Sequence, residues 1–450
     1  MNIQEVAECC HGQIVNCKKS AKTEVEGGVV DSRLVKDKNI FFASKGARVD
    51  GHDYINKAFS MGASVCVCER VPDDVKKPCI VVPDTMTALA DIAAYYLGTL
   101  SCKVVGITGS VGKTTTKEFI AAILSAKYNV IKTQKNFNNE VGLPLTVLSI
   151  RPEHEVAVLE MGIADFGQMR FLANIARPDV EVITNIGTCH LERLGDRDGV
   201  FKAKTEMFDY LQVDGSVCLF YDDDKLCQVK EVDGKPPVFF GFGEGADIRA
   251  TDVKSYGLKG SSAKVTGPDF DMNIRVNLPG KHMINDALAA IAVARCLGLN
   301  SYEIIEGLKN VESLEGRSHI ILGEKYTIID DVYNANPASM RAALDMLSLA
   351  DTRKVAILGD MFELGEKEVE YHEEIGTYAV DKCDVLVAIG KLSYNMALKA
   401  KAAVKIPIYH YDTKEEFMES MGEILKDGDS ILLKASHGMD FKAILDKLIA

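Results

Sequence analysis

The sequence lacks the segments that mark membrane and secreted proteins. No apolar run approaches 18 residues, so a membrane-spanning helix is not expected. The N-terminus, MNIQEVAECCHG, has no basic start followed by an apolar core, which argues against a secretory signal and predicts a cytoplasmic protein. Positive charge is also scarce, because 52 Lys and Arg stand against 65 Asp and Glu, for a net charge of −13. A broad basic face for nucleic acid is therefore not expected.

Cysteine pairs with the spacing of metal ligands are missing as well. None of the 12 cysteines belongs to a C-x-x-C pair, so a zinc ribbon is not expected. In a cytosolic chain we interpret these cysteines as small core residues rather than as disulfides or ligands.

The sequence contains a repeated alternation of apolar strands and helices. Its 450 residues exceed what one core can hold, which predicts several domains. CKVVGIT (102–108), EVAVLEMG (155–162) and DVEVITNIG (179–187) are continuous apolar runs typical of buried parallel strands. The expected fold is α/β with three domains: a small N-terminal α/β domain (1–100), a central doubly wound domain with a phosphate-binding loop (101–315), and a C-terminal Rossmann-like α/β domain (316–450).

One stretch is similar to a phosphate-binding loop but lacks one of its glycines. In GITGSVGKTTTK (106–117), the pattern G-x-x-x-x-G-K-[ST] would require glycine where Ile107 stands. The loop still follows a buried strand and opens a helix, so backbone N–H groups would converge on an anion. A tight turn that merely needs glycine is the alternative. The prediction of ATP binding covers Gly109, Ser110, Val111, Gly112, Lys113, Thr114 and Thr115, with Lys113 on the outer phosphates and Thr114 on Mg²⁺.

Two side chains that follow buried strands are candidate metal ligands beside Thr114. Glu160 ends the strand VAVLE, and His190 follows the next strand in NIGTCHLERLG. Parallel strands deliver such residues to the carboxyl edge of a sheet, where the loop also lies. Magnesium needs several oxygen ligands, of which Thr114 supplies only one. An ordinary strand-end carboxylate and a structural histidine are the alternatives.

Lys204 lies within an apolar helical stripe. In GVFKAKTEMFDYL, the stripe consists of Val200, Met207, Phe208 and Leu211. Burial would lower the pKa of the lysine and leave part of its amine neutral. A neutral amine can react with CO₂ to form a carbamate, so Lys204 is a candidate N6-carboxylysine and metal ligand. A lysine that snorkels from the edge of the stripe is the alternative that spacing leaves open.

Together these motifs resemble the Mur ligase family. The loop, NFNNEVGLPLT (136–146), LEMG (159–162), NIGTCHLERLG (185–195) and KAKTEMF (202–208) carry the resemblance, which spans nearly the whole chain. The family forms amide bonds with ATP in the cytoplasm of bacteria, in the peptidoglycan biosynthesis on which the cell wall, cell shape and cell division depend. The resemblance implies ATP, two Mg²⁺ ions and the catalytic residues Lys113, Glu160, His190 and Lys204.

The flanking segments resemble one member of the family, which joins D-alanyl-D-alanine to UDP-N-acetylmuramoyl-tripeptide. Residues 29–63 are similar to its UDP-sugar domain, and IIDDVYNANPASMRAAL (328–344) with ILGDMFELGE (357–366) to its third domain. The implied substrate contacts are Asp31, Ser32, Arg33, Gly46, Asp50, His52, Tyr333, Asn334 and Asn336. The implied nucleotide contacts beyond the loop are Asn139, His282, Asn285, Arg317 and Asp331. A monomer is expected.

Some alternatives stay open at this point. VYNANP could be turn chemistry rather than a substrate contact. Lys434-Ala-Ser-His437 departs from the family's usual K-[GA]-S-R, which puts the role of that arginine in doubt here. A sister ligase that adds one amino acid, a folylpolyglutamate synthase and a nucleotide-switched binding protein are the competing functions. The third residue of the peptide, lysine or diaminopimelate, is not decided by the sequence.

Overall fold

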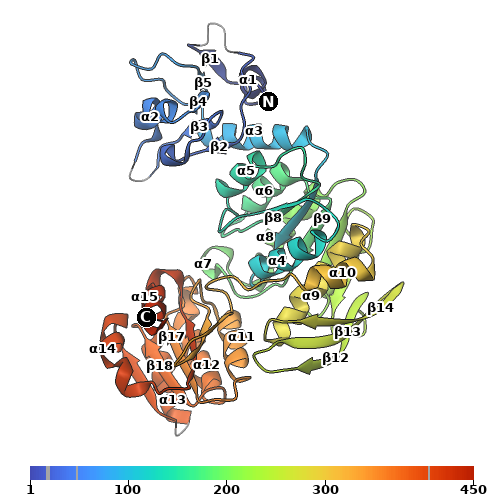
Figure 1. Cartoon of the computed structure of the whole chain (residues 1–450). Coiled ribbons are helices and arrows are strands. Elements are labelled where there is room, and N and C mark those ends of the chain that lie inside the picture. The colour runs from blue at the N-terminus through green and yellow to red at the C-terminus, as the bar shows by residue number, and fades with distance from the viewer. Residues whose placement is uncertain (17–20, 47–48, 404–405, 450) are drawn as a thin grey trace.

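The chain folds around three sheets, each covered by helices (Figure 1). The computed structural model describes residues 1–16, 21–46, 49–403 and 406–449. Residues 47 and 48 of the predicted substrate segment 46–52 thus lie outside the described residues. Within the described part of the chain, no helix combines the length and the apolar character that a membrane crossing requires.

The N-terminal sheet has the strand order β1-β5-β4-β3-β2, in which β1 is antiparallel to β5 and the other neighbours are parallel. Its elements are α1 (Ile3–Cys9), β1 (Gln13–Val15), β2 (Gly28–Val29), β3 (Ile40–Ala43), α2 (Ile55–Ser60), β4 (Val65–Cys68), β5 (Cys79–Val81) and α3 (Thr85–Gly98). Two short 3₁₀ turns, Ser32–Leu34 and Gly51–Tyr54, precede β3 and α2.

The central sheet has the order β14-β13-β12-β11-β10-β9-β6-β8-β7 and is parallel from β7 to β12. Its first half comprises β6 (Lys103–Thr108), α4 (Lys113–Leu124), β7 (Val130–Lys132), α5 (Gly142–Leu148), β8 (Val156–Glu160), α6 (Gln168–Ala176), β9 (Val180–Ile183), α7 (Leu191–Leu194) and α8 (Arg197–Thr205). Its second half comprises β10 (Ser216–Phe220), β11 (Val238–Gly241), β12 (Ile248–Ser255), β13 (Ser261–Gly267), β14 (Phe270–Val276), α9 (Lys281–Cys296) and α10 (Ser301–Leu308).

The antiparallel extension β12–β14 is a feature that the sequence analysis did not anticipate. Its buried residues alternate with more accessible ones: Ala263 and Val265 in β13 with half-buried residues, and Met272, Ile274 and Val276 in β14 with exposed residues. This period of two is the signal of a sheet with one solvated face, and it would have located these strands.

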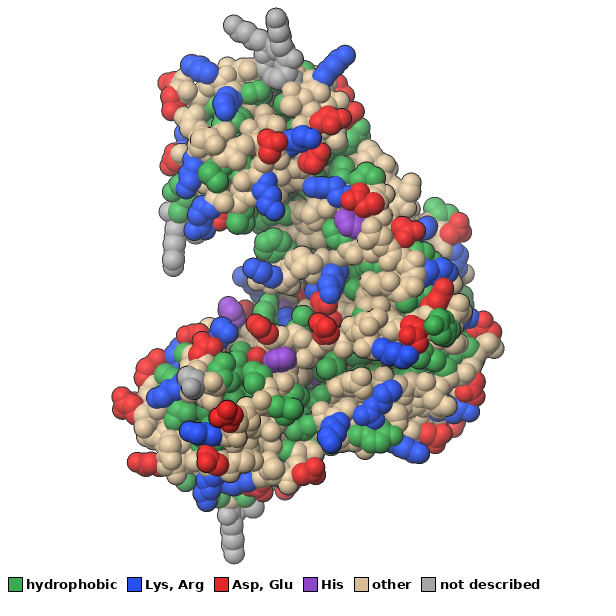
Figure 2. Space-filling view, viewed as in Figure 1, with side chains coloured by type: hydrophobic (Ala, Val, Ile, Leu, Met, Phe, Trp, Pro, Cys, Tyr) green, Lys and Arg blue, Asp and Glu red, His purple; other side chains and the backbone are tan. Residues whose placement is uncertain are grey.

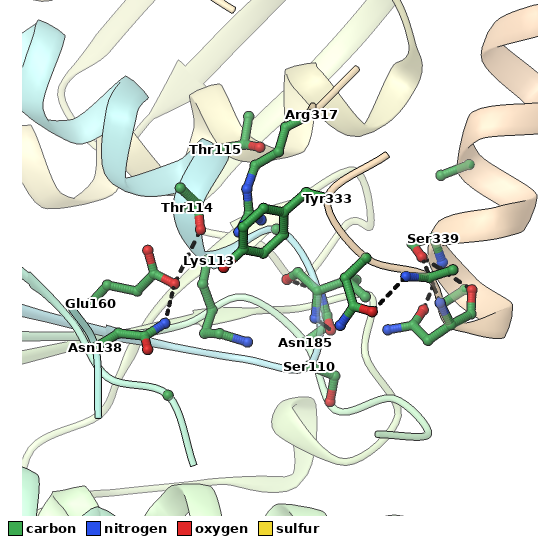
Figure 3. A pocket seen from close by; sticks show the side chains of 18 of the residues that line it. Ser110, Lys113, Thr114, Thr115, Asn138, Glu160, Asn185, Arg317, Tyr333 and Ser339 are labelled. Atoms are coloured by element: carbon green, nitrogen blue, oxygen red, sulfur yellow. Dashed lines mark hydrogen bonds between the residues drawn. The ribbon is translucent and has the colours of Figure 1, made fainter. Parts of the chain in front are cut away.

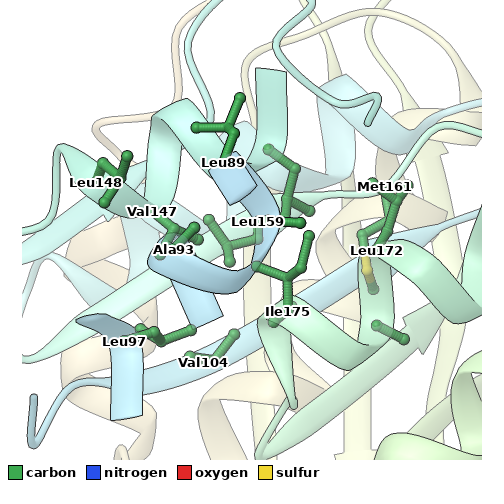
Figure 4. Packing of buried hydrophobic residues seen from close by; sticks show 14 of the residues in the cluster. Leu89, Ala93, Leu97, Val104, Val147, Leu148, Leu159, Met161, Leu172 and Ile175 are labelled. Atoms are coloured by element: carbon green, nitrogen blue, oxygen red, sulfur yellow. The ribbon is translucent and has the colours of Figure 1, made fainter. Parts of the chain in front are cut away.

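Helices cover the central sheet on both faces. One layer packs α4, α9 and α10 against apolar residues of β6 and β8. The other layer holds α5 and α6 and also α3, so the last helix of the N-terminal region joins the core of the central sheet. Figure 4 shows Leu89, Ala93 and Leu97 of α3 among the residues of this layer. Because α3 belongs to this core, the division at residue 100 remains a proposal, as does the division at 315.

The C-terminal sheet has the order β15-β16-β20-β17-β18-β19, parallel except at the β15–β16 edge. Its elements are β15 (His319–Leu322), β16 (Thr327–Asp330), α11 (Pro337–Leu347), β17 (Lys354–Gly359), α12 (Glu368–Ala379), β18 (Val385–Ile389), α13 (Ser393–Ala403), β19 (Ile408–Tyr411), α14 (Lys414–Ile424), β20 (Ser430–Lys434) and α15 (Lys442–Ile449). The surface is hollowed between the N-terminal and C-terminal domains, and on the visible face basic and acidic side chains are interspersed (Figure 2).

Candidate active site

The glycine loop follows the carboxyl end of β6, the strand that lies between β8 and β9 in the sheet. Gly109 has φ 152°, and a Cβ there would stand 1.9 Å from Thr184 Oγ1, so no larger residue fits. Gly112 has φ 85° and caps α4. Ile107, in place of the usual first glycine, is a buried residue of β6 whose carbonyl accepts from Met161 N at 2.8 Å. That glycine is dispensable here because its position is still part of the strand.

The loop is held by the neighbouring strand end and by its own lysine. Asn185, after β9, donates from Nδ2 to Val111 O (3.0 Å) and accepts from Val111 N (3.1 Å). The Lys113 ammonium donates to Gly109 O at 2.8 Å. Successive N–H groups and the start of α4 therefore form a cradle for an anion, with Lys113 at its rim.

Glu160, at the end of β8, faces the start of α4 (Figure 3). Its Oε1 accepts from Thr114 Oγ1 (3.1 Å) and from Asn138 Nδ2 (2.8 Å). Its Oε2 is buried and has no hydrogen-bond partner among the described residues. A buried carboxylate oxygen without a donor is costly, and a bound cation would satisfy it. Thr114 and Glu160 therefore fit a magnesium ion.

Lys117 is a site residue that the sequence analysis missed. It is buried one turn after Lys113, and its ammonium lies 3.8 Å from Glu160 Oε2 while donating to Thr133 O at 2.7 Å. The signal was present, since Lys117 is the last residue of the quoted motif and faces the sheet four positions after Lys113. It gives the Glu160 carboxylate a fixed positive neighbour.

Lys204 is buried, with 1% of its surface exposed. Burial, aided by the charge of Lys113 and opposed by Cys189, lowers the pKa of Lys204 to about 8. Among the described residues no carboxylate lies within ion-pair distance of its amine. A fraction of neutral amine near neutral pH meets the chemical requirement for a carbamate.

The helical stripe that carries Lys204 is shorter than expected. The helix α8 ends at Thr205, and Glu206–Tyr210 form a 3₁₀ turn, so Met207 is buried while Phe208 and Leu211 are only half-buried. Thr205 Oγ1 donates back to Phe201 O at 2.9 Å, a bond that competes with continuation of the helix. The prediction of one continuous helical stripe to Leu211 is therefore wrong beyond Thr205.

His190 caps the short helix α7 with φ 51°, and its Nδ1 lies 2.9 Å from Glu363 Oε2 of the C-terminal domain. Burial lowers the pKa of His190, and Glu363 opposes that effect. Among the described residues no group of three His, Cys, Asp or Glu side chains gathers as a metal site. The role of His190 as a ligand therefore stays a prediction, and in this structure the side chain joins two domains.

A cavity of about 530 Å³ lies between the central and C-terminal domains. Most of the predicted nucleotide and acceptor residues line it: Ser110, Val111, Gly112, Lys113, Thr114, Thr115, Asn139, Glu160, His190, His282, Asn285, Arg317, Asp331, Tyr333, Asn334 and Asn336. Gly109 and Lys204 are not part of its lining. The first residues of α9 thus face the glycine loop, and the loop after β16 closes the opposite side.

The cavity wall contains polar residues with hydrogen-bond partners and others without. Burial lowers the pKa of His282, and Asn285 Oδ1 is buried with no partner among the described residues. The side chain of Asn139 accepts from Gly142 N at 2.9 Å. Thr116 donates to Asp286 at 2.6 Å, and burial raises the pKa of Asp286 to about 7. Asp286 was not predicted, because 170 residues separate it from Thr116.

The C-terminal wall is organised by Lys434, which the sequence analysis did not assign. Its buried ammonium donates to Asp331 Oδ2 (2.7 Å) and Asn334 O (2.8 Å), so it holds both ends of the loop after β16. The Arg317 guanidinium lies 3.9 Å from the centre of the Tyr333 ring, and the centre of the His437 ring lies 5.9 Å from it. His437 thus occupies the place next to Tyr333 in the segment that departs from the family pattern.

Asn336 has a structural role whatever it binds. Its side chain accepts from Ser339 N at 2.8 Å and caps α11, as turn chemistry would predict. Asn334 Oδ1 likewise accepts from Ala335 N at 2.9 Å. Substrate contact by these two residues stays a prediction.

The predicted residues of the N-terminal domain lie outside this cavity. Asp31 caps the turn that contains Ser32 and pairs with Arg33 (2.7 Å), whose hydrogen bonds lower the pKa of Asp31 to about 2. Asp50 accepts from His52 N (3.0 Å) and lies 2.6 Å from its Nδ1. The backbone N–H of Gly46 closes the same loop by donating to Val49 O. These contacts shape two loops, and their binding of a substrate stays a prediction.

Comparison with known proteins identifies this arrangement. Family models match the chain over residues 24–97 (Mur ligase family, catalytic domain), 107–294 (Mur ligase middle domain) and 316–437 (Mur ligase, glutamate ligase domain). The chain belongs to the Mur ligase family. Among Mur ligases it is similar to the UDP-N-acetylmuramoyl-tripeptide--D-alanyl-D-alanine ligase of Bacillus subtilis, with 36% identity over 99% of this chain and 98% of the relative.

Two crystal structures of Mur ligases are similar to this one. MurF from Acinetobacter baumannii superimposes with a TM-score of 0.90 and 30% identity, over 100% of this chain and 98% of the other. MurF ligase from Thermotoga maritima, in complex with ADP, gives a TM-score of 0.83 and 31% identity, over 94% and 96%. The α/β fold with three sheets is therefore that of a Mur ligase.

Proposed function

We propose that this Mur ligase joins D-alanyl-D-alanine to UDP-N-acetylmuramoyl-tripeptide with cleavage of ATP, giving ADP, phosphate and the UDP-N-acetylmuramoyl-pentapeptide. The similarity to ligases of that name over the full chain supports the substrates. The observation that carries the chemistry is the cavity in which the phosphate loop of the central domain meets Arg317, Asp331 and Tyr333 of the C-terminal domain.

The reaction needs an activated acyl group because a carboxylate is a poor acyl donor. A carboxylate oxygen of the tripeptide attacks the γ-phosphorus of ATP, and ADP leaves. The amine of D-alanyl-D-alanine then attacks the carbonyl carbon, an amine proton is lost, and phosphate leaves as the amide forms. Lys113 and Arg317 would neutralise charge on the transferring group, while enclosure of the cavity would protect the acyl phosphate from water.

A metal site fits the same wall. Thr114 Oγ1 and the unpartnered Oε2 of Glu160 would hold magnesium, and Lys204 as a carbamate and His190 are the further candidate ligands. Magnesium, when bound, would neutralise phosphate oxygens that Lys113 alone cannot. We infer two such ions, as the resemblance to the family implies. His282, Asn285 and Asn139, which line the same cavity, would contact the nucleotide.

A ligation assay tests this proposal. Purified protein is mixed with UDP-N-acetylmuramoyl-tripeptide, ATP and D-alanyl-D-alanine, and the product mass and released phosphate are followed. Phosphate release must depend on the dipeptide. Activity with single amino acids or glutamate would favour a sister ligase or a folylpolyglutamate synthase, and hydrolysis without any acceptor would favour a nucleotide-switched binding protein. We propose that the enzyme works as a monomer in the bacterial cytoplasm.

A further inference from the structure

A second cavity, of about 430 Å³, adjoins the active-site cavity. Met86 and Thr87 of α3 line one side of it, and Phe166 and Phe171, before and within α6, line the other. Glu140 and Gln168 belong to the lining of both cavities, so the two spaces meet at these side chains. In Figure 1, α3 lies directly above α5 and α6, and α3 contacts α6.

The lining of this second cavity is mixed: Met86, Phe166 and Phe171 are apolar, Thr87 and Gln168 are polar, and Glu140 is charged. Phe166 leaves 43% of its surface exposed. Glu140 is the one ionisable side chain in the described lining, and its carboxylate has no hydrogen bond or ion pair with another described residue. Apolar side chains beside a carboxylate without a partner fit an aliphatic chain that ends in a cation.

The position of the cavity suggests which part of the substrate would enter it. In the proposed function, on which this inference rests, the reacting carboxylate belongs to the third residue of the tripeptide and lies in the cavity that Lys113 and Glu160 line. The side chain on the same carbon atom must then leave toward an adjoining space. The second cavity is such a space, and it lies on the side of the N-terminal domain, where the UDP-sugar is expected.

We propose that the second cavity binds the side chain of the third peptide residue and that Glu140 pairs with its terminal ammonium. The apolar stem would lie between Met86 and Phe166. Lysine and diaminopimelate, the two candidates for the third residue, share this ammonium. Glu140 would determine specificity through binding, and it takes no part in transfer of the phosphoryl group.

Calorimetric titration tests this directly, because it does not require turnover. UDP-N-acetylmuramoyl-tripeptides that end in lysine, norleucine, alanine or diaminopimelate are titrated into wild type, Glu140→Gln and Glu153→Gln. Norleucine keeps the stem and lacks the ammonium, and Glu153 is an exposed glutamate outside both cavities. A charge-assisted hydrogen bond predicts that Glu140→Gln raises the Kd for the lysine peptide roughly tenfold and leaves that for norleucine unchanged. Glu153→Gln should change neither Kd.

The remaining titrations distinguish binding of the aliphatic stem from pairing with the ammonium. Phe166→Ala should raise the Kd for the lysine and norleucine peptides alike and leave the alanine peptide unchanged. An equal effect of Glu140→Gln on lysine and norleucine peptides, or no effect on either, overturns the pairing. A loss with diaminopimelate equal to that with lysine supports the shared ammonium, whereas tighter binding of diaminopimelate by Glu140→Gln contradicts it. Absence of product in the ligation assay would refute the proposed function separately, because binding is measured without ATP cleavage.

Discussion

Replacement of Lys204 by methionine should stabilise the protein and impair the enzyme. The amine is buried, and its pKa falls from 10.5, the ordinary value for lysine, to about 8. Each pKa unit corresponds to about 1.4 kcal/mol, so the fold holds the ammonium at a cost of about 3 kcal/mol. Methionine has a similar length and no charge. In buffer free of CO₂ at pH 7, Lys204→Met should therefore raise the free energy of unfolding by up to about 3 kcal/mol.

The size of this stabilisation depends on pH in a defined way. Because the folded pKa lies below the unfolded one, the unfolded chain binds more protons between pH 8 and 10.5. The free energy of unfolding of the wild type therefore rises with pH in that window. The stability advantage of Lys204→Met is full below pH 8 and disappears toward pH 10.5. Thermal unfolding from pH 6.5 to 10.5 measures it. Lys202→Met, on the exposed side of the same helix, is the matched control and should shift stability by less than about 0.5 kcal/mol.

The ligation activity of the same variants is measured with and without CO₂. If Lys204 acts as a carbamate, wild-type ligation should fall when CO₂ is removed and recover when bicarbonate is added, while Lys204→Met should be nearly inactive in both. The reasoning is refuted if Lys204→Met destabilises the protein at pH 7, or if its stability difference from wild type does not change with pH. Full ligation by Lys204→Met would remove the residue from the mechanism.

Three further changes test other parts of the structure. Gly109→Ala places a Cβ 1.9 Å from Thr184 Oγ1 at φ 152°, so it should weaken ATP binding at least tenfold in a fluorescence titration; unchanged affinity would contradict the loop geometry. Lys434→Met leaves Asp331 without its 2.7 Å partner and should lower stability by about 3 kcal/mol in thermal unfolding, a loss that Asp331→Asn in the same chain should partly restore. Glu181 in β9 is buried, and its two carboxylate oxygens have no hydrogen-bond partner among the described residues. Burial raises the pKa of Glu181 to about 9, so this residue lowers the stability of the wild type as pH rises from 4.5 to 9, and Glu181→Leu should stabilise the protein above pH 5. A variant less stable than the wild type at pH 8 would contradict that burial.

The part of the site that the sequence could predict lies close to recognisable strand ends. The apolar runs before Gly109 and up to Glu160 mark buried parallel strands, and such strands end at one edge of a sheet, so local pattern alone places the loop and the carboxylate together. The motif also marks Gly109 and Gly112 as positions of a tight loop, and in the structure their φ values of 152° and 85° favour glycine.

The remainder depends on contacts between distant residues, for which a single sequence carries no signal. Thr116 and Asp286 are 170 residues apart, and Lys434 and Asp331 are 103 apart. The contact of His190 with Glu363 likewise depends on how two domains meet. The second cavity was missed for the same reason, because its walls come from α3 and α6 and neither helix carries a motif for it.

The most direct test of the account is the product formed from UDP-N-acetylmuramoyl-tripeptide, ATP and D-alanyl-D-alanine. The account predicts a product heavier than the tripeptide substrate by D-alanyl-D-alanine less one water, formed with one phosphate per amide and abolished by Lys113→Ala. Phosphate release without the dipeptide, an amide with a single amino acid instead, or full turnover by Lys113→Ala would contradict it.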